Sequence, residues 1–429
     1  MTVIDMRHRG RRRTLPLSGG LTAIGARGTG PVARTLSHPL ADYYLMLVAT
    51  ALLVGVGVLM VLSASSVWSS VNYDGDSYYY LVRQLVFLAI GVPVAWWLSR
   101  RNAAMLAVLG WGGLIVSIVL LCLVFTPLGL DLYGNRSWLY VEGLGTVQPS
   151  EFAKAAVICW AAAVLANRTQ TLNDPRRMLF PFLAGFGVVL GLVLVQGDVG
   201  TALIIGMIML AMLWFVGAPL RILAALGGFA VLCLAGMVLI SPERMSRIFS
   251  FMGSGEATSD QPMNAIYALA SGGWWGLGPG ASRQKWGGLY NGAQTDYVFA
   301  VLGEEFGLFG TLTVLALFFV LGFTGLRIAA RCTNRLLSYA AAGMTAWLMC
   351  QALTNILVVL RMLPVVGVPL PFLSQGGSAL LANLIAVGVL LSAARQEPAA
   401  AKLLIAGPDH KAPRLTSVLD VPRPSRSRN

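Results

Sequence analysis

The sequence predicts an all-α polytopic membrane protein with about ten transmembrane helices. Of its 429 residues, 56% are hydrophobic and only 11% are charged, which is more apolar surface than a water-soluble fold of this length buries. The apolar residues gather in ten runs, each close to the roughly 20 residues that a helix needs to cross a bilayer. Most of the 31 Lys and Arg residues lie in the two ends of the chain and in alternate loops between the runs.

The ten predicted spans are residues 44–63, 81–98, 103–125, 151–165, 178–196, 201–216, 222–240, 297–321, 337–360 and 380–394. The loop after the third span is too polar to cross lipid but carries Leu, Trp and Tyr, so we expect it to lie at the membrane interface. The longest loop, residues 241–296, joins spans seven and eight.

Ten spans place both ends of the chain on one side of the membrane. Because Lys and Arg are enriched on that side, we predict cytoplasmic tails and an extracellular loop 241–296. Residues 1–40 hold seven arginines among Gly, Pro and Ser, which predicts a disordered basic arm. Residues 41–396 form the membrane domain, and we predict that residues 397–429 are a disordered basic tail. The five cysteines show no pairing in outer loops, so no disulfide is expected.

One carboxylate, Asp296, lies where a glycine-rich stretch becomes the eighth span at about Tyr297. An ionised side chain beside a long apolar run is costly, and an acid in such a place is a candidate functional residue. The alternative is that Thr295 or Asp296 caps the helix by accepting hydrogen bonds from its first free amides. The spacing leaves both interpretations open.

Other polar residues gather at the outer ends of the spans. Glu151 and Lys154 are three residues apart and share one helix face. They either form a buried ion pair that orients two helices, or Lys154 binds an anion such as a lipid pyrophosphate together with Arg136. Two turns into the eighth span, at least one of Glu304 and Glu305 is expected to face a polar cavity or a cation. Further substrate-binding candidates are Gln148, Ser150, Gln284, Lys285, Asn355 and Ser374.

Several motifs in order carry a family resemblance: GNRSW, QPSEFAK, QGDVGTALI, AIYALASGGWWGLGPG, QTDYVFAVLGEEFG and LPVVGVPLPFLSQGGS. From about residue 43 to residue 401 the chain resembles the SEDS family (shape, elongation, division and sporulation). The resemblance implies a ten-span peptidoglycan glycosyltransferase of the bacterial plasma membrane that polymerises Lipid II beside a class B penicillin-binding protein. It implies that Asp296 is the catalytic acid of a TDF-like motif, and that Arg136 and Lys154 are the family's basic residues.

The same resemblance makes Mg²⁺ or Mn²⁺ a candidate cofactor, with Asp296 as one possible ligand, although the sequence shows no dedicated metal site; it implies no organic cofactor. The chain departs from the family pattern at Gln294, where a His is usual, and at Gln375 and Ala379. The basic arm favours the division branch, with synthesis at the septum beside other division proteins, over the elongation branch.

Two other functions are compatible with the sequence. One is a Lipid II flippase or other transporter, in which Lys154, Glu304 and Glu305 would be gating or coupling charges. The other is a non-catalytic scaffold that recruits a transpeptidase to the division site. The net charge of +13 reflects membrane orientation rather than nucleic-acid binding.

Overall fold

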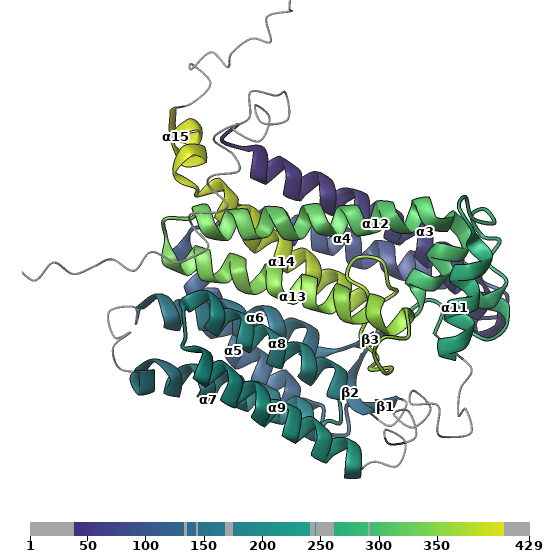
Figure 1. Cartoon of the computed structure of the whole chain (residues 1–429), viewed down its shortest axis with the longest axis horizontal. Helices are drawn as coiled ribbons and strands as arrows, with labels where there is room; N and C mark the ends of the chain where they lie inside the picture. Colours follow the sequence, from purple (N-terminus) through teal and green to yellow (C-terminus); the bar gives the residue numbers. More distant parts are fainter. Residues whose placement is uncertain are drawn as a thin grey trace, which may run out of the picture.

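The computed structural model describes residues 38–132, 135–142, 145–167, 175–240, 245, 261–290 and 292–406. Its long helices lie side by side in one bundle (Figure 1). The helices are α3 (Ala41–Asn72), α4 (Tyr79–Ser99), α5 (Ala103–Leu123), α6 (Pro149–Asn167), α7 (Pro175–Val195), α8 (Val199–Val216), α9 (Leu220–Ile240), α11 (Gln261–Gly272), α12 (Val298–Arg331), α13 (Arg335–Val359), α14 (Gly377–Arg395) and α15 (Pro398–Ala406), with a short 3-10 helix η2 (Gln284–Trp286). The strands are β1 (Gly129–Leu132), β2 (Asn135–Val141) and β3 (Gly145–Val147).

Each of the ten predicted spans coincides with one helix, from α3 to α9 and from α12 to α14. Eight of these helices are long and apolar enough to cross a membrane, so the chain is a multi-pass membrane protein. The apolar parts of α7 and α9, Leu179–Val195 and Leu220–Cys233, are shorter in the described part of the chain. The helical architecture is therefore confirmed, and the number of ten crossings stays a prediction.

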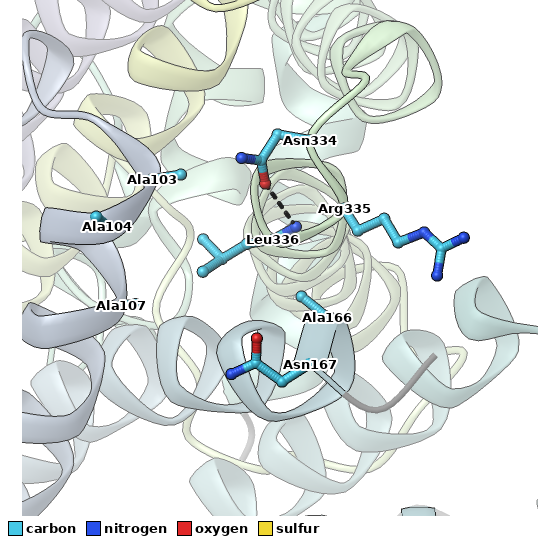
Figure 2. A pocket seen from close by; sticks show the side chains of 8 residues that line it. All are labelled: Ala103, Ala104, Ala107, Ala166, Asn167, Asn334, Arg335 and Leu336. Carbon is cyan, nitrogen blue, oxygen red and sulfur yellow. Dashed lines mark hydrogen bonds between the residues drawn. The ribbon is translucent and has the colours of Figure 1, made fainter. Parts of the chain in front are cut away.

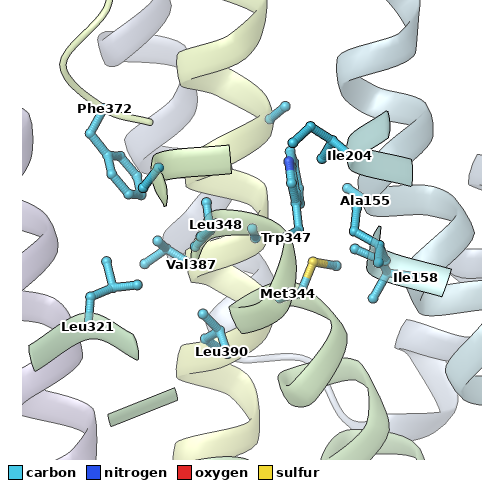
Figure 3. Packing of buried hydrophobic residues seen from close by; sticks show 14 of the residues in the cluster. Ala155, Ile158, Ile204, Leu321, Met344, Trp347, Leu348, Phe372, Val387 and Leu390 are labelled. Carbon is cyan, nitrogen blue, oxygen red and sulfur yellow. The ribbon is translucent and has the colours of Figure 1, made fainter. Parts of the chain in front are cut away.

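Helix α13 lies at the centre of the bundle, between α6, α8, α12 and α14. Figure 3 shows side chains of this core, among them Trp347 and Met344 of α13, Ile158 of α6, Ile204 of α8 and Leu390 of α14. Around this centre α3 packs along α12, α4 along α14, and α5 along α6. We call the end where α3 begins and α14 ends the tail end, and the opposite end, where α12 begins, the loop end.

The loop between α5 and α6 adds a small antiparallel sheet, in the order β1-β2-β3, to the predicted helical bundle. In β2, Ser137 and Leu139 are buried while Arg136 and Tyr140 are exposed, which is the alternation of a half-buried strand. The sequence did not predict this sheet, which forms because the alternating residues of NRSWLYV pair with strands on both sides. The position of the loop at the membrane interface stays a prediction.

The structure differs from the prediction in other places too. Helix α3 continues to Asn72 and α12 to Arg331, well past the predicted span ends at 63 and 321. The loop 241–296 contains the helix α11. The predicted disordered tail begins with a helix, α15, at Pro398, because its alanine and leucine residues favour a helix. The basic arm up to residue 37 and the tail after residue 406 lie outside the described residues.

An ion cluster joins three elements at the tail end. Asp42 of α3 accepts from two cations of α12, Arg327 at 2.9 Å and Arg331 at 3.0 Å. Glu397, in the turn between α14 and α15, is buried beside Asp42. Burial, and then the charge of Asp42, raise the pKa of Glu397 to about 8, although the two arginines oppose this shift. Glu397 is therefore held in its neutral form at neutral pH.

This raised pKa predicts that the protein loses stability as pH rises from about 4.5 to about 8. In that range an unfolded Glu397 releases its proton while the folded one retains it, at a cost of about 1.4 kcal/mol per pH unit. Glu397→Gln removes the titration, so the apparent melting temperature of the variant should match that of the wild type near pH 5 and exceed it near pH 8.5. Exposed Glu142→Gln is the control, and an equal difference at both pH values would contradict the prediction.

Candidate active site

Asp296 lies in a turn at the loop end, two residues before α12 begins. The backbone N–H groups of Thr295 and Tyr297 both donate to the carbonyl of Gly292, at 3.2 and 3.0 Å. The N-cap of α12 is Tyr297, and its side chain makes no capping hydrogen bond. The N-cap residue is thus neither Thr295 nor Asp296, and a bond from either side chain to the first amides of the helix stays a prediction. The side chain of Asp296 is half-buried.

The segment 294–296 is attached to the connection between α13 and α14. The side chain of Asn355 donates to the carbonyl of Asp296 at 2.9 Å, and Ser374 donates to that of Thr295 at 2.6 Å. The carbonyl of residue 294 accepts from the backbone N–H that follows Ser374, at 2.8 Å. The structure thus brings together three predicted site residues, Asp296, Asn355 and Ser374.

Lys154 is enclosed in the bundle and fully paired. Its ammonium lies 2.8 Å from Glu151 and 2.8 Å from the side-chain oxygen of Gln351, and 5.0 Å from the ring centre of Trp347. Lys154 and Glu151 are each only 1% exposed. Of the two interpretations of this pair, the structure has the buried ion pair, which lies within α6. The hydrogen bond from Lys154 to Gln351 joins α6 to α13. A contact of Lys154 with substrate stays a prediction.

Gln351 connects this ion pair to the segment that carries Asp296. Gln351 and Asn355 are one turn apart on α13, and their amides donate to the neighbouring carbonyls of Pro369 at 3.0 Å and Val368 at 2.8 Å. Sequence reasoning missed Gln351. The sequence pattern that could have revealed it is a pair of amide side chains at i and i+4 in an apolar span. Such residues share one helix face, and their amides must find polar partners.

The start of α6 carries two further candidates. The side chain of Gln148 donates to the carboxylate of Asp198 at 2.8 Å. The same carboxylate caps α8 by accepting from the N–H of Thr201. Ser150 is fully buried, and its hydroxyl has no hydrogen-bond partner. The same is true of one side-chain oxygen each in Glu151, Asn355 and Gln294. Buried polar atoms without partners are costly, so we expect ordered water to hydrogen-bond to these four oxygen atoms.

Arg136 is exposed on β2 and is held by its neighbours rather than by the Asp296 segment. Its guanidinium donates to the carbonyl of Thr126 at 2.8 Å, and its backbone N–H donates to the carbonyl of Gln196 at 3.2 Å. The other N–H groups of the guanidinium can bind a phosphate in the forked geometry that arginine favours. Of the two predicted anion-binding residues, Arg136 is the accessible one.

Lys285 belongs to a second buried cluster. Its ammonium donates to Glu305 at 3.1 Å, to Ser63 of α3 at 2.9 Å and to the carbonyl of Gly280 at 2.7 Å, which uses all three of its hydrogens. The expectation that Glu304 or Glu305 faces a cation is therefore confirmed. In this arrangement Lys285 has no donor left for substrate.

Glu304 fixes the backbone around η2. It accepts from the hydroxyl of Ser282 at 2.5 Å and from the N–H groups of Arg283 at 3.0 Å and Gln284 at 3.3 Å. Gln284 contacts Glu304 through its backbone N–H, and a contact of its side chain with substrate stays a prediction. Together the two glutamates hold the glycine-rich segment 273–290 against α12 and α3.

The same segment packs against a kink in α12 at Gly307, whose φ of 64° and ψ of −161° suit only glycine. A Cβ on Gly307 would lie 2.4 Å from the nitrogen of Gly276 and 2.6 Å from the carbonyl oxygen of Trp274. Because both contacts are with backbone, neither can move aside easily.

We therefore expect Gly307→Ala to destabilise the protein by more than the roughly 1–3 kcal/mol of backbone strain alone, seen as a lower apparent melting temperature in detergent. Gly206→Ala is the matched control, because Gly206 is buried in α8 with no atom within 4 Å of its added Cβ. Equal effects of the two substitutions would show that the kink carries no structural constraint.

The described residues contain no group of three or more His, Cys, Asp and Glu side chains that could hold a metal ion. Asp296 is the single carboxylate of the segment 292–297. These residues do not fit a metal centre built by the protein alone, although Mg²⁺ commonly takes one or two carboxylates and obtains its other ligands from substrate phosphates and water.

A cavity of about 460 Å³ lies at the tail end, where α5 and α13 begin and α6 ends (Figure 2). Half of the residues that line it are alanines, and Asn167, Asn334 and Arg335 are the polar ones. Asn355 is about 20 residues further along α13, which places the Asp296 segment about 30 Å away. This cavity is therefore separate from the candidate site.

The chain matches the family model described as cell cycle protein, the model of FtsW, RodA and SpoVE, over residues 43–399. It is 36% identical over 393 residues to the probable peptidoglycan glycosyltransferase FtsW of Mycobacterium tuberculosis, covering 91% of this chain and 74% of that protein. It is also 36% identical over 362 residues to the stage V sporulation protein E of Bacillus subtilis, covering 82% and 96%.

Solved structures show the same fold. A chain from a structure of a peptidoglycan synthase complex, described as coordinating polymerization and crosslinking, is similar with a TM-score of 0.67 and 27% identity, covering 82% of this chain and 97% of that chain. The rod shape determining protein RodA of Thermus thermophilus is similar with a TM-score of 0.60 and 26% identity, covering 82% and 96%.

Proposed function

This chain belongs to the family of cell cycle proteins that includes FtsW, RodA and SpoVE, and we propose that Asp296 is the general base with which it joins Lipid II into glycan strands. The chain is a peptidoglycan glycosyltransferase. The observation that best supports the role of Asp296 is its placement: a half-buried carboxylate at the start of a membrane helix, with its backbone fixed and unpartnered buried oxygens on neighbouring elements.

The reaction transfers the growing glycan chain from its lipid carrier to the sugar of a Lipid II molecule. The 4-hydroxyl oxygen of the acceptor Lipid II attacks the anomeric carbon of the lipid-linked growing chain. The bond from that carbon to the pyrophosphate oxygen breaks, and undecaprenyl pyrophosphate leaves with the bonding electrons, with inversion at carbon. Asp296 takes the hydroxyl proton, a task for which an ionised carboxylate is suited because it only accepts hydrogen bonds. Such general-base help contributes about 10²–10⁴-fold to a rate.

Arg136 stabilises the leaving pyrophosphate in this proposal. Its guanidinium is exposed, and one of its N–H groups is used by Thr126, so the rest of the fork can meet phosphate oxygens as negative charge develops. Lys154 acts through the position of α6 and α13 instead, since its ammonium is enclosed by Glu151 and Gln351. Mg²⁺ or Mn²⁺ stays a proposal: Asp296 would hold it, and it would neutralise negative charge on the pyrophosphate.

The partner in this proposal is a class B penicillin-binding protein, which crosslinks the strands that this chain makes. The similarity to a chain of a synthase complex that coordinates polymerization and crosslinking supports it. We place the protein in the bacterial plasma membrane at the division septum, with other division proteins nearby, because several similar curated proteins carry the name FtsW.

The structure favours a polymerase over a flippase. A transporter that uses Lys154, Glu304 and Glu305 as gating charges needs these side chains to change partners. Each is instead enclosed, Lys154 by Glu151 and Gln351, and the glutamates by the segment 282–285.

The decisive experiment places the purified chain in liposomes with fluorescent Lipid II, alone and with a class B penicillin-binding protein. We expect glycan strands on an electrophoresis gel. Translocation of Lipid II between leaflets without any polymer would favour the flippase. Neither activity, in a complex that still assembles, would favour the scaffold.

A further inference from the structure

We infer that Asn355 and Ser374 are positioning residues for Asp296 and do not bind substrate as the sequence had suggested; this inference rests on the proposed function of Asp296. The carbonyls of three consecutive residues, 294, 295 and 296, each accept a hydrogen bond from the end of α13 or from the loop before α14. Backbone fixed at three successive residues fixes the direction in which the middle and last side chains leave the chain.

Asn355 has both amide hydrogens committed to the protein. Its Nδ2 donates to the carbonyl of Asp296 at 2.9 Å and to that of Val368 at 2.8 Å, and the residue is 1% exposed. The side-chain amide of asparagine has two N–H donors on one nitrogen, so it can bond two carbonyls at once. Asn355 therefore ties the Asp296 segment to residue 368, and a substrate would have to break one of these bonds to use the same donor.

Ser374 is committed in the same way. Its hydroxyl accepts from the N–H of Leu370 at 2.8 Å and donates its single proton to the carbonyl of Thr295 at 2.6 Å. Between these residues, buried Phe372 has a φ of 66°, a conformation that bulky residues rarely adopt and that persists only where the surroundings enforce it. The loop 370–374 is thus held in one shape, and that shape presents the hydroxyl to Thr295.

We call the three hydrogen bonds to the carbonyls of residues 294, 295 and 296 the clamp. The clamp is anchored beyond the loop 370–374. Gln351 donates to the carbonyl of Pro369 and accepts from Lys154 and Trp347, so residues 368 and 369 are fixed to α13 through two amides. The side chain of Asp296 is therefore positioned from the buried core of the bundle. Because a displacement of about 1 Å can cost about 100-fold in rate, loosening this clamp should slow the reaction without weakening substrate binding.

The test compares Asn355→Leu and Ser374→Ala with the wild type, each purified with the class B penicillin-binding protein and assayed with Lipid II. We expect kcat per folded protein to fall about 10–100-fold while KM for Lipid II changes by less than about twofold. Ser374→Thr retains the hydroxyl and should restore most of the rate. Asn383→Leu is the control, because Asn383 is a buried asparagine of α14 with no hydrogen bond to the segment 292–297 among the described residues.

Hydrogen exchange provides a readout that does not depend on activity. In Ser374→Ala the amides of residues 292–297 should exchange faster, while those in the middle of α13 should be unchanged. A raised KM with unchanged kcat would assign Asn355 and Ser374 to substrate binding and overturn the inference, and so would wild-type kinetics and exchange. Asp296→Asn, measured in parallel, separates the two proposals. If Asp296→Asn is inactive while Ser374→Ala has wild-type kcat, only the positioning role of Asn355 and Ser374 fails. If Asp296→Asn is active, the proposed general base fails, whatever the hydrogen exchange shows.

Discussion

Lys154→Met is expected to destabilise the protein by about 3–5 kcal/mol, the cost of leaving a buried charge without its partner. Glu151 would stay in the bundle at 1% exposure, with its carboxylate facing a thioether. The side-chain oxygen of Gln351 would lose one of its two donors. The apparent melting temperature in detergent measures the loss. Lys402→Met is the control, because Lys402 is exposed on α15.

The double variant Glu151→Gln with Lys154→Met tests why the single variant fails. Removing both charges leaves no unpaired ion, so most of the stability should return, as it commonly does when a buried pair is replaced by neutral groups. Polymerisation should return with it if Lys154 acts through the helices that it joins. A double variant that is stable but inactive would mean that Lys154 meets the substrate itself.

The sequence predicted the helices well because the membrane imposes a strong rule on them. A span needs about 20 apolar residues, and every backbone group within it must find a partner inside the helix. Such a rule sets the existence of a helix but not where it ends. Helix α3 runs on to Asn72 through SASSVWSSVN because its serines find hydrogen-bond partners: Ser65 and Ser66 donate to carbonyls of the same helix, and Ser63 donates to Glu305 of α12. That partner lies 242 residues away in the chain, so no local pattern could reveal it.

The sheet was missed for a related reason. Strand pairing between β1, β2 and β3 depends on register and on turns, and the paired residues come from separate parts of the loop. The alternation in NRSWLYV was visible, but in a loop rich in glycine it could equally have belonged to an irregular interfacial segment.

The candidate site was predicted in part. Asp296, Asn355 and Ser374 were chosen for being polar at the ends of spans, and the structure places them together. The same reasoning also chose Lys154 and Lys285, which lie buried in ion pairs. Whether a lysine at a span end faces a ligand or a carboxylate depends on which residues of other helices meet it, and single-sequence patterns do not contain that information.

Asp296→Asn is expected to lower the rate of glycan polymerisation by about 10²–10⁴-fold, the usual contribution of a general base. Asparagine has nearly the same shape but cannot accept the proton of the attacking hydroxyl. The fold should be retained, because Asn355 contacts the backbone carbonyl of residue 296 rather than its side chain. Asp74→Asn is the control, since Asp74 is exposed in the loop after α3 and has a positive φ that asparagine tolerates.

The most direct test is therefore the initial rate at which purified wild-type protein and Asp296→Asn, each in complex with a class B penicillin-binding protein, convert Lipid II into glycan strands. We predict that the variant folds, assembles and binds Lipid II as the wild type does, yet makes strands at least about 100-fold more slowly. Strand formation by Asp296→Asn within about twofold of the wild-type rate would contradict the assignment of Asp296 as the base.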